Sequence, residues 1–232
     1  MWDFLWAVPL TIITFLAMRK LSFKLKYPIF NPLLLSIILI ISLLLLLKIP
    51  YDRYFSGSHI IHQTLQIGVV SLAFPLYKQL PDIIRRWKVL LSVCFLSSLI
   101  AMMSGVGLVW VLGGDNIIAA SVLPKSVTTP IALVVAKETG GIEAIAAACV
   151  LFVGLLGAIF GHMLLNLFHI KSRAARGLAM GATAHVIGTA RCYEVNEEEG
   201  AFSSLALVLC GVFTALTAPF VFALLLKLKE IL

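Results

Sequence analysis

The stretch from residue 119 to residue 130 reads AASVLPKSVTTP. Its flanks are apolar enough for a lipid bilayer, but Pro124 and Pro130 each interrupt helical hydrogen bonding. Lys125 between them adds a charge that a lipid-facing helix would avoid. A second stretch, from residue 181 to residue 191, reads GATAHVIGTAR and mixes glycines and hydroxyls with a histidine and an arginine. The two stretches predict broken helical segments at 116–137 and 177–193.

Long apolar runs surround these two segments. The chain has 232 residues, of which 61% are hydrophobic and 12% are charged, whereas about a quarter of a soluble domain is charged. Because about 20 apolar residues cross a bilayer as a helix, we expect six full transmembrane helices, at 2–18, 31–48, 60–77, 89–112, 142–165 and 201–226. The predicted fold class is an all-α polytopic membrane protein, a single domain over residues 1–232 in a bacterial inner membrane.

Basic residues cluster in three of the connections, at 19–26, 78–88 and 171–176. Cytoplasmic loops are enriched in Lys and Arg, so these connections are predicted to be cytoplasmic and the N-terminus periplasmic. The loop 49–58 and the turn 113–115 then lie outside. In this topology the first broken segment is re-entrant from the outer side and the second is re-entrant from the cytoplasmic side. A full crossing by each segment is the alternative.

The third span is the least apolar of the six, because it contains His62, Gln63, Gln66 and Pro75. Polar side chains at membrane depth are costly against lipid. We therefore expect this face of the span to contact protein or water.

A weak internal repeat relates the two broken segments. A shift of 59 residues places Val127 on Val186, and it superposes the broken segments and the spans that follow them. It divides the chain into N-terminal helices at 1–88, expected to act as a scaffold, a first broken-helix unit at 89–165 and a second at 166–232. Units that enter from opposite faces form the inverted repeat of secondary transporters, whose paired broken helices mark the binding site.

The first broken segment predicts an anion site. In the run Thr128-Thr129-Pro130, threonine is a good helix cap and proline is favoured at the first helical position, so a half-helix capped by threonine should start at Pro130. Its free amide groups and positive dipole end would suit a carboxylate. Lys125 or Arg191 would add charge, and His185 is the candidate for proton coupling because imidazole titrates near neutrality. The candidate substrate-binding residues are Lys125, Ser126, Thr128, Thr129, Pro130, Thr183, His185, Gly188, Thr189 and Arg191.

Each of these residues also has a purely structural interpretation. Hydroxyls and glycines serve close helix packing in membranes, and long cationic side chains can reach the interface. Gly157 and Gly161 lie four residues apart and predict a helix-contact face, with a packing role for the neighbouring His162. The acidic run at 194–199 is expected to be a solvated turn.

Nothing in the apolar segments favours catalysis. The sequence contains no nucleophile elbow, phosphate-binding loop or metal-ligand spacing. We therefore expect no catalytic residue, metal or cofactor, and the chain is not predicted to be an enzyme. The formal charge of +7 comes largely from basic residues beside apolar runs, which argues against nucleic acid as a partner.

Several runs of the sequence resemble the signature of the LrgB/CidB family: PKSVTTPIA at 124–132, AARGLAMG at 174–181, AHVIGTAR at 184–191 and EGAFSSLA at 199–206. The resemblance covers nearly the whole chain. It implies a small LrgA/CidA-like membrane partner and two alternative functions. One is holin-like control of murein hydrolase export and cell lysis. The other is carboxylate transport, since a plastid relative moves glycolate and glycerate and bacterial relatives are linked to pyruvate uptake.

Between these two functions the residues favour transport of a small monocarboxylate. A holin-like oligomer gives no reason to hold Lys, Thr, His and Arg in two broken segments, whereas a carrier needs donors and positive potential around its anion. The expected partners are the lipid bilayer, the LrgA/CidA-like protein and the carboxylate. A homodimer is left open for a chain of this size.

Overall fold

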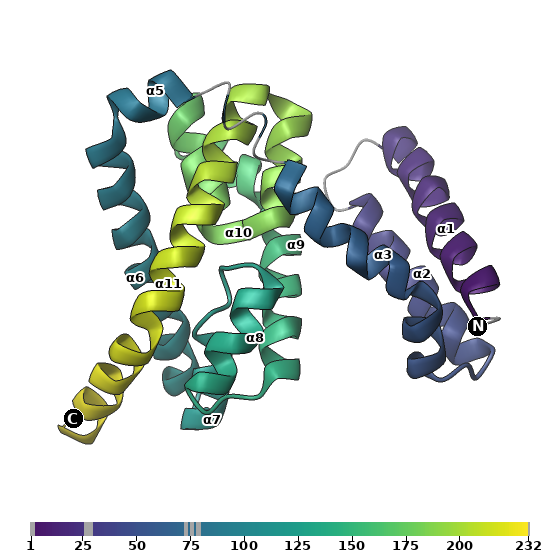
Figure 1. Ribbon diagram of the computed structural model, residues 1–232, viewed down its shortest axis with the longest axis horizontal. Helices are drawn as coiled ribbons and strands as arrows, with labels where there is room; N and C mark the ends of the chain where they lie inside the picture. Colours follow the sequence, from purple (N-terminus) through teal and green to yellow (C-terminus); the bar gives the residue numbers. More distant parts are fainter. Residues whose placement is uncertain (1–2, 26–29, 72–73, 75–76, 78–79, 232) are drawn as a thin grey trace. The chain divides into compact units, whose positions relative to one another are not determined.

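The computed structural model describes residues 3–25, 30–71, 74, 77 and 80–231. All regular secondary structure in this part of the chain is α-helical, as predicted (Figure 1). The chain divides into two compact units, residues 1–72 and 73–232. The predictions for Pro75, for the side chains of His62 and Gln66, and for positions 26 and 78–79 of the basic connections lie outside the described residues.

The described part of the N-terminal unit contains the helices α1 (Phe4–Leu25), α2 (Pro32–Leu46) and α3 (Tyr51–Ser71). Asn31 fixes the start of α2, because its side-chain oxygen accepts hydrogen bonds from Leu33 N at 2.9 Å and Leu34 N at 3.4 Å. This satisfies amide groups that a helix start leaves without partners.

The predicted loop at 49–58 is wrong, because α3 begins at Tyr51. The carbonyl oxygen of Pro50 accepts the first backbone hydrogen bonds of the helix. Asp52 lies in the first turn, where its negative charge is favourable beside the positive end of the helix dipole. Gly57 serves close packing rather than a turn, since a Cβ there would collide with the backbone at the start of α1.

The C-terminal unit contains both predicted broken segments. Among its described residues the helices with given bounds are α5 (Leu80–Arg85), α6 (Trp87–Val111), α7 (Asn116–Val122), α8 (Thr129–Glu138), α9 (Glu143–Leu167), α10 (Arg173–Val195) and α11 (Glu197–Ile231). Leu90 near the start of α6 packs with Phe202 near the start of α11. Farther along both helices, Val106 packs with Phe222. The two helices therefore run side by side in the same direction (Figure 1).

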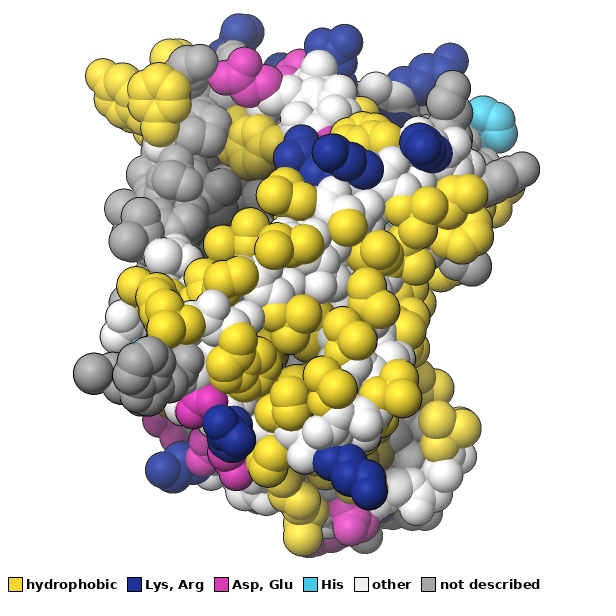
Figure 2. Space-filling view, turned by 90° about the vertical axis from the view of Figure 1, so that its right-hand side faces the viewer, with side chains coloured by type: hydrophobic (Ala, Val, Ile, Leu, Met, Phe, Trp, Pro, Cys, Tyr) yellow, Lys and Arg dark blue, Asp and Glu magenta, His cyan; other side chains and the backbone are white. Residues whose placement is uncertain are grey.

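Four described helices are long and apolar enough to cross a membrane: α1, α6, α9 and α11. The apolar α2 has only 15 residues, about 22 Å of helix at 1.5 Å per residue. Hydrophobic side chains cover the middle of the face in Figure 2, and Lys and Arg gather towards its opposite ends. The chain is thus a multi-pass helical membrane protein, and the count of six full spans stays a prediction.

Two local predictions for the C-terminal unit are confirmed. The turn at 113–115 is present, with Gly113 at a φ of 80° and the Asp115 side chain capping α7 through Ile118 N at 2.7 Å. The helix-contact face of α9 is also present. A side chain at Gly157 or Gly161 would overlap α10, so these glycines let α9 and α10 approach closely.

Candidate functional site

The first helix break lies between α7 and α8, where residues 123–128 are not α-helical. Thr128 caps α8 by its backbone conformation alone, because its side chain makes no capping hydrogen bond. The helix starts at Thr129, one residue before the predicted start at Pro130. Proline fits the first turn because the amide hydrogen it lacks would have no partner there. Because the Thr128 side chain makes no capping hydrogen bond, the amide groups at the start of α8 have no side-chain cap.

Lys125 is half-buried inside this break. Its Nζ donates a hydrogen bond of 2.6 Å to the carbonyl oxygen of Ala101 in α6. The amine packs on Gly105, where an added Cβ would lie 3.2 Å from Nζ. Among the described residues no carboxylate forms an ion pair with Lys125. A partly desolvated cation without a counterion is costly, and an anion beside it would lower that cost.

The second helix break lies at His185 within α10. This residue has a φ of 40° and a ψ of −136°, a conformation that a residue with a Cβ rarely adopts. Its imidazole is buried, and Nε2 lies 2.7 Å from the carbonyl oxygen of Val150 in α9. Since a carbonyl only accepts, Nε2 carries the proton in this hydrogen bond. Gly154 makes room for the ring, because a Cβ there would lie 2.5 Å from its Cε1.

Both breaks contact the same residue of α9. The side chain of Val150 packs with Val127 inside the first break and with Ala132 in the α8 helix that follows it. The carbonyl oxygen of Val150 accepts the hydrogen bond from His185 of the second break. The structure therefore brings the two segments singled out in the sequence to one level of α9.

Several other candidates are occupied within the protein. The Thr189 hydroxyl, which is buried, donates to the carbonyl oxygen of His185 at 2.8 Å and lies 2.8 Å from Ser203 Oγ. Gly188 faces Ala184 and Met180 of its own helix. Arg191 donates to Glu194 Oε2 at 2.7 Å in a largely exposed pair. Lys125 and Arg191 were both predicted as a possible cation for the carboxylate. Of these two, Lys125 lies inside a helix break.

Thr183 lies on a different face of α10. Its hydroxyl donates to the carbonyl oxygen of Ala179 at 2.7 Å. Together with residues of α9 it lines a groove of about 540 Å³ whose other lining residues are almost all apolar. Ser126 is buried in the first break.

The sequence reasoning missed a buried ionic cluster. Glu199 is only 4% exposed, so the prediction of a solvated turn is wrong for this member of the acidic run. Its Oε1 accepts from Arg176 Nε at 2.9 Å, and its Oε2 lies 2.9 Å from His162 Nε2. Arg176 belongs to the first turn of α10 rather than to a basic loop. Its Nη1 also donates to the Asn166 side chain and the carbonyl oxygen of Ile170.

A helical pattern could have revealed this cluster. Glu199 lies four residues before Ser203, and both are buried in α11. Residues three or four apart share a helix face, so the spacing places Glu199 on the same face as a small residue and is a signal for a side chain that points into the protein. A buried carboxylate then requires a cationic partner.

Cys192 lies beside this cluster, within 4.8 Å of the ligand atoms of His162 and Glu199. Three such donors could contact a cation. However, the guanidinium of Arg176 already holds the same carboxylate, and its fixed positive charge would repel a metal ion. We therefore interpret the cluster as an ion-pair network.

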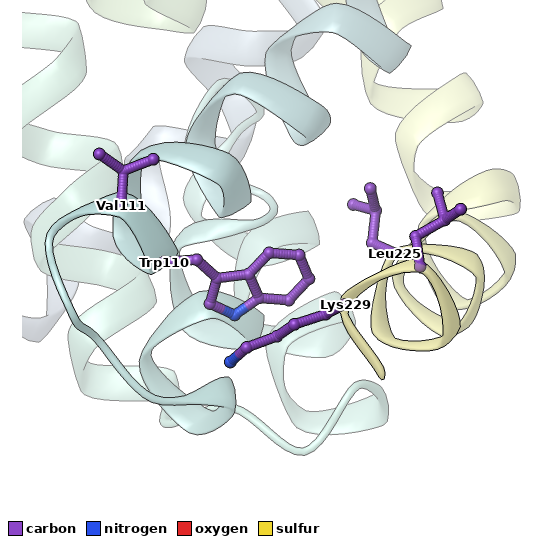
Figure 3. A pocket seen from close by; sticks show the side chains of 5 residues that line it. Trp110, Val111, Leu225 and Lys229 are labelled. Carbon is purple, nitrogen blue, oxygen red and sulfur yellow. The ribbon is translucent and has the colours of Figure 1, made fainter. Parts of the chain in front are cut away.

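A shallow pocket of about 430 Å³ lies between the ends of α6 and α11 (Figure 3). Lys229 Nζ lies 4.9 Å from the centroid of the Trp110 ring, and both side chains donate to Asn116 Oδ1. The remaining lining residues, Val111, Leu225 and Leu228, are apolar. Tryptophan and lysine at a helix end are typical of the membrane interface, so this pocket has the character of an anchor rather than a substrate site.

The fold and these contacts define an all-helical, multi-pass membrane protein in which two broken helices meet on a third. Residues 11–224 match the LrgB-like family. A protein of Haemophilus influenzae is 42% identical over 215 residues, which cover 93% of each chain. The holin-like protein CidB of Staphylococcus epidermidis is 34% identical over 214 residues, 90% of this chain and 92% of CidB. YxaC of Bacillus subtilis is 33% identical over 212 residues, 91% of this chain and 92% of YxaC.

The chain therefore belongs to the LrgB-like family. No solved structure matches it.

Proposed function

We propose that this chain is the membrane subunit of a carrier for small monocarboxylates such as pyruvate, glycolate or glycerate. The observation that carries the proposal is the half-buried amine of Lys125, which has a backbone carbonyl as its partner and lies in the break that leads into the uncapped start of α8. A cation and a helix start both favour a carboxylate. Thr128, Thr129 and the first amide groups of α8 would hold it.

We further propose that both broken segments are re-entrant hairpins. Gly181 before the second break and Thr189 after it both contact Ser203 of α11, so the two arms of α10 return to one level. In the first segment, Val135 of α8 packs with Ala119 and Ala120 of α7. These contacts favour segments that enter and leave on the same side over segments that cross.

The paired hairpins are our basis for an inverted repeat. The shift of 59 residues that relates the two segments places Ser126, inside the first break, on His185 at the second. With six full spans around them, hairpins entering from opposite sides would alternately open the level of Val150 to each side of the membrane. The orientation with a periplasmic N-terminus in a bacterial inner membrane belongs to the same proposal.

A holin-like regulator of murein hydrolase export and lysis is the second candidate, because relatives over most of the chain are named holin-like CidB. Measuring substrate uptake distinguishes the carrier from the holin-like regulator. Proteoliposomes with this chain, alone and with an LrgA/CidA-like partner, are given labelled pyruvate, glycolate and glycerate. A carrier gives saturable uptake that excess unlabelled substrate blocks. Absence of uptake from folded protein under both conditions would favour the regulator.

Lys125→Gln is expected to lower the uptake rate by about tenfold or more, because a charge-assisted hydrogen bond is worth about 1.5–3 kcal/mol. The matched control is Lys137→Gln, which removes an exposed lysine from the last turn of α8 and should leave uptake unchanged. Initial rates at several substrate concentrations make the comparison. Equal rates for the two variants would remove Lys125 from the site.

A further inference from the structure

We propose that Glu199 and His162, held by Arg176, take up one proton for each carboxylate carried, so that the chain is a proton symporter. This inference rests on the proposed transport function and adds the coupling ion to it. It concerns a cluster formed by the first turns of α10 and α11 and by His162 of α9, separate from the break at Lys125 that would hold the carboxylate.

The cluster is built to hold or release one proton. Both carboxylate oxygens of Glu199 are occupied, one by Arg176 and the other by His162. The His162 Nδ1 is buried, and within the described part of the chain it has no hydrogen-bond partner. An ionised carboxylate only accepts, so His162 Nε2 donates in the hydrogen bond of 2.9 Å to Glu199 Oε2. The added proton can then bind to His162 Nδ1 or to a carboxylate oxygen of Glu199.

The charges make symport electrically favourable. With neutral imidazole, the charges of Arg176 and Glu199 cancel. One added proton, on Glu199 or on His162, gives the cluster a charge of plus one. A monocarboxylate at the broken segments brings minus one. The loaded and the empty carrier then have the same net charge, which avoids moving an uncompensated charge through a low-dielectric region.

Other polar groups around the pair do not compete for this role. Cys192 of α10 faces it as a thiol, and Asn166 of α9 is neutral and bonded to Arg176. Arg191, one residue before Cys192, is paired with Glu194. Glu198 of α11 lies 3.6 Å from Arg173 in an exposed pair. The buried exchangeable proton therefore belongs to Glu199 and His162.

One helix connects the proton pair to the substrate level. Arg176 lies in the first turn of α10, and the same helix breaks at His185. Protonating Glu199 would weaken its attraction to Arg176 and so release the first arm of α10 from α11. The proton pair thus acts on α10, and the break of α10 meets the carboxylate-binding segment at Val150 of α9. This shared residue is our proposed route for coupling the two sites.

The proton role predicted for His185 has a weaker geometric basis. Its Nε2 faces a backbone carbonyl oxygen, which cannot exchange a proton as a carboxylate can. The test therefore includes His185→Gln as the variant that would lose coupling if His185 carried the proton.

The test uses the full chain, with its LrgA/CidA-like partner if wild-type uptake requires one, in proteoliposomes with labelled pyruvate. In wild type, an alkaline interior should drive accumulation of up to about tenfold per pH unit, as expected for one proton per anion. His162→Gln and Glu199→Gln should lose this accumulation. Both should keep counterflow, the exchange of external label for internal unlabelled pyruvate at equal pH. His169→Asn, at an exposed histidine in the α9–α10 connection, is the control and should behave as wild type.

The outcomes separate the two proposals. Wild-type protein without counterflow would contradict the carrier itself. If wild-type protein shows counterflow at equal pH but a pH gradient drives no net accumulation of pyruvate, proton coupling alone would be overturned. Gradient-driven accumulation that survives in His162→Gln, or that is lost in His185→Gln but not in His162→Gln, would overturn the assignment to this pair. If Glu199→Gln fails to fold, His162→Gln decides the question.

Discussion

Arg176→Ala is expected to destabilise the protein by about 3–5 kcal/mol, because it leaves the carboxylate of Glu199 buried without its cation. The guanidinium also bonds the side chain of Asn166 and the carbonyl oxygen of Ile170, so the substitution breaks contacts to three partners. The readout is the temperature at which the detergent-solubilised protein loses its monodisperse size-exclusion peak. A large fall in that temperature is the expected result.

The matched control is Arg173→Ala, three residues earlier in the same helix. Arg173 lies 3.6 Å from Glu198, and the two side chains are 60% and 41% exposed. Exposed ion pairs contribute about 0–1 kcal/mol, so this variant should melt close to wild type. Equal melting of the two variants would mean that the Glu199 carboxylate is solvated, and the proton-coupling cluster would lose its basis.

Gly181→Val should abolish the close contact between α10 and α11. A Cβ at this position would overlap the backbone carbonyl of Ser203, and a backbone atom in the middle of a helix cannot move aside. Overpacking of this kind costs about 1–3 kcal/mol or more. The same contact positions the Thr189–Ser203 hydrogen bond. We expect a large loss of folded protein in the membrane, measured by fluorescence-detected size exclusion.

Gly107→Ala in α6 is the control for this second prediction. An added Cβ there meets nothing within 4 Å, and alanine is favoured over glycine in a helix by about 0.5–1 kcal/mol. Folded yield should be unchanged or higher. If the two glycine variants gave equal yields, α10 and α11 would not be in contact at Gly181.

The helix breaks were predictable because their cause is local. Two prolines and a lysine interrupt an apolar run around Lys125, and no longer-range information is needed to expect a break there. Likewise, the glycines beside His185 predicted an irregular segment. The exact start of α8 was missed by one residue, since proline is compatible with any position in a first helical turn.

The fate of individual polar side chains was less predictable, because it depends on which helix lies opposite. Thr189 and Arg191 carry the groups that a substrate would need, but Ser203 and Glu194 occupy them. Glu199 is one of several glutamates in a polar run, and only the packing of α10 on α11 buries it. The start of α3 was missed for a simpler reason, because a proline, an aspartate and a glycine also fit a loop.

Counterflow of pyruvate in wild-type proteoliposomes, measured with the LrgA/CidA-like partner if uptake requires it, is the measurement that most directly distinguishes a carrier from a holin-like pore. Vesicles are loaded with unlabelled pyruvate and diluted into a trace of labelled pyruvate at equal pH. A carrier with its anion site at Lys125 should accumulate label transiently above the outside concentration, and Lys125→Gln should strongly reduce this overshoot. Label that only equilibrates, with no overshoot in wild type, would contradict a carrier and indicate a pore.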